Sequence, residues 1–188
     1  MKKIIVSEHI TLDGFLAGPN GEMDWIQLDK EMFDMVNEFT VTADTALYGR
    51  ITYEMMEAYW PTAAGKPNAT KHDIEHSSWY NQSQKVVLSK TIKNNKDKTI
   101  IIHENASAEL EKLKTDGDKN ILVFGSPSVV HLLMQHNLID EYWLFVNPVI
   151  LGEGIPMFTE LKNRASLKLV KSKVFDYGVT ALNYHVIR

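Results

Sequence analysis

The chain has 188 residues, 44% of them hydrophobic and 23% charged, which is typical of a single globular domain with its own core. It contains no cysteine, which excludes disulfides, iron–sulfur clusters and thiolate zinc sites, and its formal net charge of −4 argues against a nucleic-acid-binding protein. No apolar stretch reaches the ~18 residues of a membrane helix or forms a signal-peptide core, so we expect a cytoplasmic protein.

The first half of the chain predicts a strand, an irregular segment and three helices interrupted by one strand. The irregular segment lies between the turn signals Asp13-Gly14 and Asn20-Gly21, and Asp29 is a good cap for the helix that follows it. The second helix is expected to stop before Pro61, because the residue before a proline avoids the helical region, and 61–71 then form a surface loop. The predicted elements are a strand at 4–12, a helix from about residue 30, a strand at 45–48, a helix at 52–59 and a short helix near 72–80.

Strands and helices alternate in the second half until the last two strands. The predicted elements are strands at 85–89, 99–103, 120–124 and 141–150, with helices at 106–114 and 127–136. This alternation predicts a mainly parallel sheet with helices on its faces. Strands at 166–175 and 179–187, joined by Asp176-Tyr177-Gly178, predict an antiparallel hairpin. We therefore expect one α/β domain over 1–188 with a mixed, mostly parallel sheet.

Three junctions that follow predicted strands are suited to phosphate groups, because ligands of open α/β sheets bind at the carboxyl ends of the strands. At the first junction Gly49 permits a tight turn and a helix begins near Thr52, so free N–H groups face a ligand there. Arg50 adds a guanidinium fork for phosphate oxygens. The alternative is an ordinary capped helix with a solvated arginine.

The second and third junctions offer hydroxyl groups beside a strand end. Ser89 and Lys90, followed by another hydroxyl, suit a terminal phosphate such as the 2′-phosphate that distinguishes NADP from NAD. An ordinary turn is the alternative for this segment. At the third junction Gly125 follows a buried strand, Ser126 is a good N-cap and Pro127 is a good first helical residue. A well-made helix start without a ligand is the alternative there.

A glycine-containing loop follows the strand at 141–150. Gly152 and Gly154 give this loop a permissive backbone. Neither the Gly-x-Gly-x-x-Gly pattern nor a Walker lysine motif is present, which disfavours a Rossmann domain and a phosphate-loop nucleotidase.

The histidines do not predict a metal site. His72 and His76 are four residues apart and share one helical face, but no carboxylate stands at a known ligand spacing to complete a site. We therefore expect these two side chains to be solvated at the surface and the protein to bind no metal.

Taken in order, the motifs resemble those of a known family. They are Thr11-Leu12-Asp13-Gly14-Phe15, Gly49-Arg50-Ile51-Thr52-Tyr53-Glu54, Val87-Leu88-Ser89-Lys90-Thr91, Val123-Phe124-Gly125-Ser126 and the segment from Leu138 to Gly154. The chain resembles bacterial dihydrofolate-reductase-like proteins that match the reductase domain of the riboflavin-biosynthesis deaminase-reductase, the RibD C-terminal domain. The resemblance implies a three-layer α/β fold with an eight- or nine-stranded mixed sheet. Two departures are Gly125-Ser126, where dihydrofolate reductases carry Gly-Gly, and Lys90, where arginine is common.

The resemblance also implies a cofactor and its contacts. NADPH would lie across the carboxyl edge of the sheet, and the family is expected to form homodimers. The implied contacts are Gly49, Arg50 and Thr52 at the phosphates, Ser89 and Lys90 near the adenosine 2′-phosphate, Gly125 and Ser126 on the pyrophosphate and nicotinamide side, and Gly152 and Gly154 in the nearby loop. The aromatic-rich strand at 142–146 is either buried internally or part of the dimer interface.

A flat heterocyclic substrate calls for a carboxylate, which accepts two ring N–H hydrogen bonds. Asp13 and Asp24 are the candidates for this catalytic role, and Trp25 is a candidate for stacking on the substrate ring. The alternatives are a turn aspartate that bonds its own backbone for Asp13, a loop or helix cap for Asp24, and simple packing for Trp25.

Three hypotheses follow from these patterns. The leading one is an NADPH-dependent reductase of a small heterocycle of pteridine or pyrimidine type. The second is a non-catalytic dinucleotide- or flavin-binding protein on the same fold. The third is a dimeric scaffold in which the three junctions are only well-capped helices.

Overall fold

The computed structural model describes residues 1–93, 96–159, 161 and 164–188. Its helices are α1 (Lys30–Thr40), α2 (Arg50–Ala63), α3 (Lys71–Gln82), α4 (Ala106–Thr115) and α5 (Pro127–Gln135). Its strands are β1 (Ile4–Thr11), β2 (Phe15–Ala17), β3 (Ala43–Gly49), β4 (Gln84–Leu88), β5 (Thr99–Ile102), β6 (Asn120–Val123), β7 (Glu141–Asn147), β8 (Ile155–Pro156), β9 (Ser166–Val174) and β10 (Thr180–Ile187).

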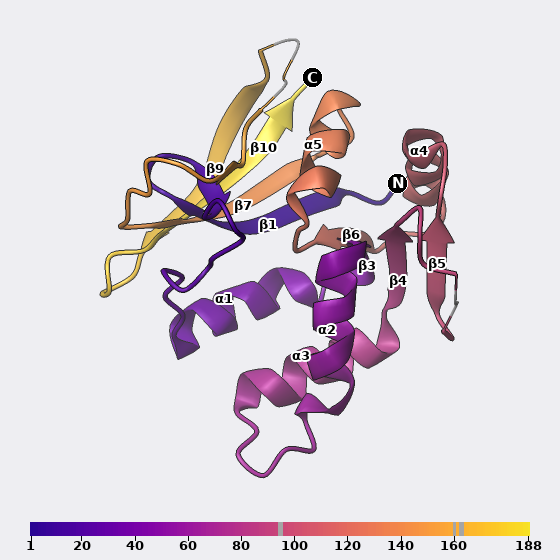
Figure 1. Ribbon diagram of the computed structural model, residues 1–188, viewed down its shortest axis with the longest axis horizontal. Helices are drawn as coiled ribbons and strands as arrows, with labels where there is room; N and C mark the ends of the chain where they lie inside the picture. Colours follow the sequence, from indigo (N-terminus) through magenta and orange to yellow (C-terminus); the bar gives the residue numbers. More distant parts are fainter. Residues whose placement is uncertain (94–95, 160, 162–163) are drawn as a thin grey trace.

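The described residues form an eight-stranded central sheet in the order β5-β4-β3-β6-β1-β7-β10-β9 (Figure 1). Every pairing from β5 to β7 is parallel, and β10 pairs antiparallel with both β7 and β9. The predicted mixed sheet with a carboxyl-terminal hairpin is therefore confirmed. A second, two-stranded sheet joins β2 to β8. These two strands were not expected, because a segment of two or three residues is too short to show the alternation of apolar and polar residues that marks a strand.

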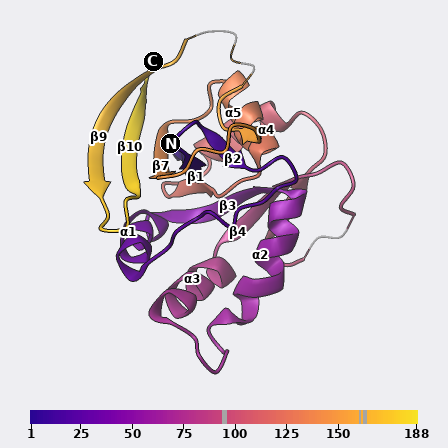
Figure 2. The ribbon, with the colours of Figure 1, turned by 60° about the vertical axis from the view of Figure 1, so that its left-hand side comes forward.

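Helices cover both faces of the sheet, which gives the fold three layers (Figure 2). Ile4, Val6 and Ile10 of β1 pack into the core beneath α4 and α5. Ile5 points to the opposite face, where it packs with Met32 and other residues of α1. Since successive strand residues face opposite sides, both faces of a central strand must be apolar. This explains the continuous apolar runs at the predicted strands.

The aromatic strand β7 is an internal element. Tyr142, Trp143, Leu144 and Phe145 are all buried between β1 and β10. Packing inside the domain therefore accounts for them, and the expected homodimer stays a prediction. Across the described ranges, no helix has the length and hydropathy that a membrane crossing requires.

Helix α2 corrects the prediction that the helix would span 52–59 and stop before Pro61. It begins at Arg50, directly after its N-cap Gly49, and continues through Pro61 to Ala63. The proline lies in the last turn, where it disturbs little of the helix. Side chains of α3 satisfy carbonyl groups of this turn, since Ser77 Oγ donates to Trp60 O at 2.7 Å. The predicted loop from residue 61 is consequently shorter.

His76 corrects the expectation of a solvated histidine pair. Its side chain is buried, its ring lies 4.2 Å from the Trp60 ring, and burial lowers its pKa to about 3. His72 is half-buried and stacks on Phe33 with ring centroids 3.8 Å apart. The two histidines are therefore neutral aromatic packing groups between α1, α2 and α3. The described residues contain no cluster of three or more metal-ligating side chains.

A nearly buried ion pair ties both ends of the chain to α4. Asp140 accepts hydrogen bonds from Lys114 Nζ at 2.5 Å, from Ile4 N at 2.9 Å and from Arg188 Nη1 at 2.6 Å. The Asp140 carboxylate therefore joins the start of β1, the end of α4 and the carboxyl terminus. Burial opposes its charge, but these donors outweigh burial and hold its pKa below the ordinary value.

We expect Asp140→Ala to lower the free energy of unfolding by about 3 kcal/mol, because the Lys114 ammonium would lose its carboxylate while remaining buried. Urea unfolding at neutral pH measures this. Lys112→Ala is the matched control, because Lys112 pairs with Glu109 at the surface and its loss should leave stability unchanged. Equal stability of the Asp140 variant and the wild type would contradict the anchoring role.

Candidate functional site

The carboxyl ends of the parallel strands form one rim of the sheet, and the three predicted junctions lie side by side on it. In the β3–β4 register Gly49 pairs with Leu88, so Ser89 follows directly beside it. In the β3–β6 register Leu47 pairs with Val123, which brings Gly49 level with Gly125 on the neighbouring strand. The structure thus brings Gly49, Ser89 and Gly125 together on the adjacent strand ends of β3, β4 and β6.

The first and third junctions are packed against each other without spare volume. A Cβ atom added at Gly49 would lie 2.1 Å from Ser126 Oγ and 3.1 Å from Ser126 Cβ. Gly125 has φ +86°, a backbone conformation that favours glycine, and a Cβ there would lie 3.4 Å from Thr52 Oγ1. The Gly125–Ser126 peptide bond is cis. Glycine is therefore favoured at position 49 by the close approach of the Ser126 side chain, and at position 125 by the positive φ.

The helices that start at this rim lack the side-chain caps found elsewhere in the described chain. Helices α2, α4 and α5 follow β3, β5 and β6, and their N-cap residues make no side-chain hydrogen bond to the first turn. By contrast, Asp29 caps α1 and Thr70 caps α3. A helix N-terminus without a side-chain cap leaves its N–H groups to water or to an anionic ligand. The rim therefore presents several backbone donors with a partial positive charge.

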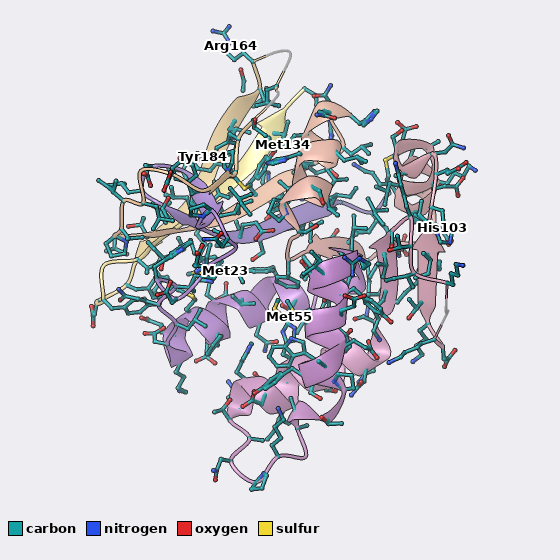
Figure 3. All side chains as sticks on the ribbon, in the orientation of Figure 1. Met23, Met55, His103, Met134, Arg164 and Tyr184 are labelled. Atoms are coloured by element: carbon teal, nitrogen blue, oxygen red, sulfur yellow. The ribbon has the colours of Figure 1, made fainter. Side chains whose placement is uncertain are left out.

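An open cleft of about 750 Å³ lies at the β4–β5 end of the rim, and it is lined by Leu88, Ser89, Lys90, Ile102, His103, Glu104, Asn105, Ala106, Ser128, Val129 and Leu132. His103 is one of the lining residues and lies at the β5 and α4 side of the molecule (Figure 3), and its Nδ1 lies 2.7 Å from Ser89 O. Ser89 Oγ is buried and accepts from Thr91 N and Ile92 N, so the segment is also a well-formed turn. Lys90 is exposed at the cleft.

The other two predicted phosphate contacts, Arg50 and Thr52, differ in exposure and in the contacts that their side chains already make within the protein. Arg50 is exposed, and its Nη1 lies 3.1 Å from Glu54 Oε2 one turn along α2. This surface ion pair is weak, so the guanidinium remains available to a stronger anion. Thr52 is buried, and its hydroxyl faces Gly125.

Asp13 is held by the backbone of the glycine loop. Its carboxylate accepts from Thr11 Oγ1 at 2.6 Å, from Gly152 N at 2.8 Å and from Leu151 N at 3.3 Å, and these bonds lower its pKa. Gly154 also packs closely, since a Cβ there would lie 2.3 Å from Ala17 O. These contacts give Asp13, Gly152 and Gly154 a structural role in fixing the loop after β7 to β1 and β2. Their catalytic and cofactor roles stay predictions.

Asp24 and Trp25 lie in the segment between β2 and α1. Asp24 is exposed, and Trp25 is partly buried, with Nε1 donating to Glu22 O at 3.2 Å. The described contacts of these residues do not join them to Gly49, Ser89 or Gly125. Their catalytic and substrate-binding roles also stay predictions.

Glu8 places a carboxyl group at the centre of the rim and was not among the site residues predicted from the sequence. Glu8 lies on β1, and its Oε1 is fully buried without a hydrogen-bond partner among the described residues. A Cβ at Gly125 would lie 3.7 Å from this oxygen. Burial raises the Glu8 pKa to about 8, although the Gly125 N–H opposes the shift. One signal was available, because Glu8 occupies an inward position in the alternation of Ile4, Val6 and Ile10.

Comparisons with known proteins agree with this fold. The model of the family described as RibD C-terminal domain matches residues 2–181. The chain is 35% identical over 188 residues to the uncharacterized protein YyaP of Bacillus subtilis (strain 168), covering 98% of this chain and 95% of YyaP.

Two solved structures share the fold at low sequence identity. A putative riboflavin biosynthesis protein from Shewanella sp. PV-4 has a TM-score of 0.73 at 22% identity, with 99% of each chain covered. Dihydrofolate reductase from Enterococcus faecalis, solved as a complex with NADP(H), has a TM-score of 0.66 at 16% identity, covering 99% of this chain and 97% of the reductase. The fold is therefore that of dihydrofolate reductase, and the family match over residues 2–181 shows that the chain belongs to the RibD C-terminal domain family.

Proposed function

We propose that the protein is an NADPH-dependent reductase that transfers hydride to a small, flat heterocycle of pteridine or pyrimidine type. The observation that carries this proposal is the row of helix N-termini at the rim, which offer backbone donors to phosphates on adjacent strands. Membership of a family whose description refers to a riboflavin-biosynthesis protein supports the reductase class. The Enterococcus faecalis enzyme, described as complexed with NADP(H), supports the choice of cofactor.

The size and polarity of the rim fit an extended dinucleotide. Three strand spacings separate β4 from β1, which is roughly 14 Å along the rim at about 4.8 Å per spacing. Ser89 and Lys90 would hold the adenosine 2′-phosphate at the cleft. The N-terminus of α2 with Arg50, and the N-terminus of α5 at Ser126, would hold the two linked phosphates between them. This leaves the nicotinamide end near β1.

When bound, NADPH supplies the hydride, and the chain's own groups supply binding and orientation. The tight packing of Gly49 against Ser126 keeps the donors in fixed positions. The heterocycle would meet a carboxylate of the segment before α1, for which Asp24 remains the candidate, with Trp25 beside it.

A non-catalytic dinucleotide- or flavin-binding protein is the second candidate. The engagement of the Asp13 carboxylate with Thr11, Leu151 and Gly152 favours it, because this carboxylate is not free to bind a substrate ring. This candidate predicts cofactor binding without turnover on any heterocycle.

NADPH should stabilise the folded protein in a concentration-dependent way. A ligand that binds only the folded state adds RT ln(1 + [L]/Kd), or about 2.7 kcal/mol at a hundredfold excess over Kd. A thermal-shift titration to millimolar NADPH measures this, and a flat titration would remove the proposal. Addition of a pterin, a dihydropterin or an aminopyrimidine as hydride acceptor then separates the reductase from the non-catalytic binder. Only the reductase oxidises NADPH, which is measured as a loss of the NADPH absorbance.

Lys90→Glu should weaken NADPH binding by about tenfold while leaving NADH binding unchanged, because only NADPH carries the 2′-phosphate. Lys119→Glu is the matched control, since Lys119 is also exposed but precedes β6 at the opposite edge of the sheet. Isothermal titration of both cofactors against both variants measures the effect. A parallel loss of NADPH and NADH affinity in the Lys90 variant would place the 2′-phosphate elsewhere.

A further inference from the structure

Glu8 occupies the point on the rim where the nicotinamide end of a dinucleotide would arrive. It lies on β1, next to β6, while the cleft with Ser89 and Lys90 lies at β4 and β5. A dinucleotide that starts in that cleft and passes the N-termini of α2 and α5 reaches β1 last. Of the strands along this path, β1 carries a buried carboxyl group facing the Gly125–Ser126 turn.

The Glu8 carboxyl is suited to pair with a ligand that has both a donor and an acceptor. Oε1 is buried with no hydrogen-bond partner in the part of the chain that the structure describes, while Glu8 as a whole residue is half-buried. A buried oxygen without a partner lowers stability, so a ligand that satisfies it gains affinity. Because burial raises the pKa to about 8, the group keeps its proton at neutral pH and can donate as well as accept.

We propose that Glu8 holds the carboxamide of the nicotinamide ring through a two-way hydrogen-bonded pair. The carboxyl O–H donates to the carboxamide oxygen, and the carboxyl C=O accepts from the carboxamide NH₂. The pair is neutral, so it loses little on transfer from water into the buried rim. This inference rests on the proposed function, because it requires a nicotinamide cofactor on the rim. In this proposal Glu8 recognises the primary amide on the nicotinamide ring, which is the reacting end of the cofactor.

None of the titratable groups on the neighbouring described elements shifts the Glu8 pKa, so burial is the main cause of its raised value. His9 points to the other face of β1, where it stacks on Phe145. His131 of α5 is engaged by Pro156 O at 2.9 Å. Arg50 and Glu54 of α2 form their own exposed pair. Burial and the Gly125 N–H are accordingly the two causes of the Glu8 shift.

The test compares the NADPH affinity of the wild type, Glu8→Gln and Glu8→Leu between about pH 7 and about pH 9.5 by cofactor fluorescence. In the wild type we expect Kd to rise about tenfold over this range, because the carboxyl must then take up a proton to form the pair. Glu8→Gln offers an amide with the same donor and acceptor, so its Kd should stay near the wild-type neutral value throughout. Glu8→Leu removes both groups, so its Kd should be about tenfold higher at neutral pH and independent of pH.

Two further ligands separate the inference from the proposed function. Adenosine 2′,5′-bisphosphate lacks the nicotinamide ring and should bind all three proteins equally. An NADPH analogue with an acetyl group in place of the carboxamide keeps the carbonyl oxygen but lacks the NH₂ donor, so it should bind the wild type more weakly than NADPH does, and the difference between the wild type and Glu8→Leu should be smaller than with NADPH. If the bisphosphate binds but Glu8→Leu and the wild type share one NADPH affinity and one pH profile, the Glu8 assignment is wrong. Failure of every ligand to bind the wild type removes the proposed function, and the Glu8 assignment with it.

The ligand-free protein provides a check that does not depend on cofactor. A raised folded-state pKa means that the folded protein binds more protons than the unfolded chain between about pH 4.5 and about pH 8, so the Glu8 contribution to stability falls as pH rises through this window. Urea unfolding should show this fall in the wild type and a smaller one in Glu8→Gln. Identical pH dependence in the two proteins would show that Glu8 is charged throughout, which overturns its role as a donor.

Discussion

Parallel pairing of the strands from β5 to β7 is the constraint on which the site depends. Parallel neighbours end at the same edge, so every turn that follows one of these strands lies on a single rim. Helix α2 starts directly after β3, and helix α5 starts at Pro127 soon after β6, so their N-termini converge there. The phosphate-suited character of the rim thus follows from topology, with side chains such as Lys90 adding selectivity. The Lys114–Asp140 pair serves the same arrangement, because it fixes β1 at the centre of the sheet.

The sequence was sufficient to predict the sheet and the position of the rim because both depend on local signals. Apolar runs bounded by Gly49, Ser89 and Gly125 mark strand ends, and Ser126-Pro127 marks a helix start. Contacts between residues far apart in the chain could not be predicted from these local signals. The close approach of Gly49 to Ser126 joins residues far apart in the chain, and the β2–β8 pairing is too short to show a period.

The errors have a common physical origin in tertiary contact. Proline was expected to end α2, but Ser77 of α3 satisfies a carbonyl of its last turn. His76 was expected in solvent, but the rings of Trp60, Trp79 and Phe124 enclose it. Glu8 was passed over because a single charged residue in a strand pattern resembles a surface position. It faces the Gly125 turn that follows β6, which arrives from much later in the chain.

The shared volume at Gly49 and Ser126 restricts the order in which these two positions can change during evolution. Any side chain at position 49 collides with Ser126 Oγ, and removal of that hydroxyl alone leaves Ser126 Cβ 3.1 Å away. A methyl group at position 49 therefore requires the Ser126 hydroxyl to rotate away and the Ser126 Cβ to shift by a few tenths of an ångström. The same change at position 49 meets neither obstacle once position 126 is glycine, so the two positions are coupled.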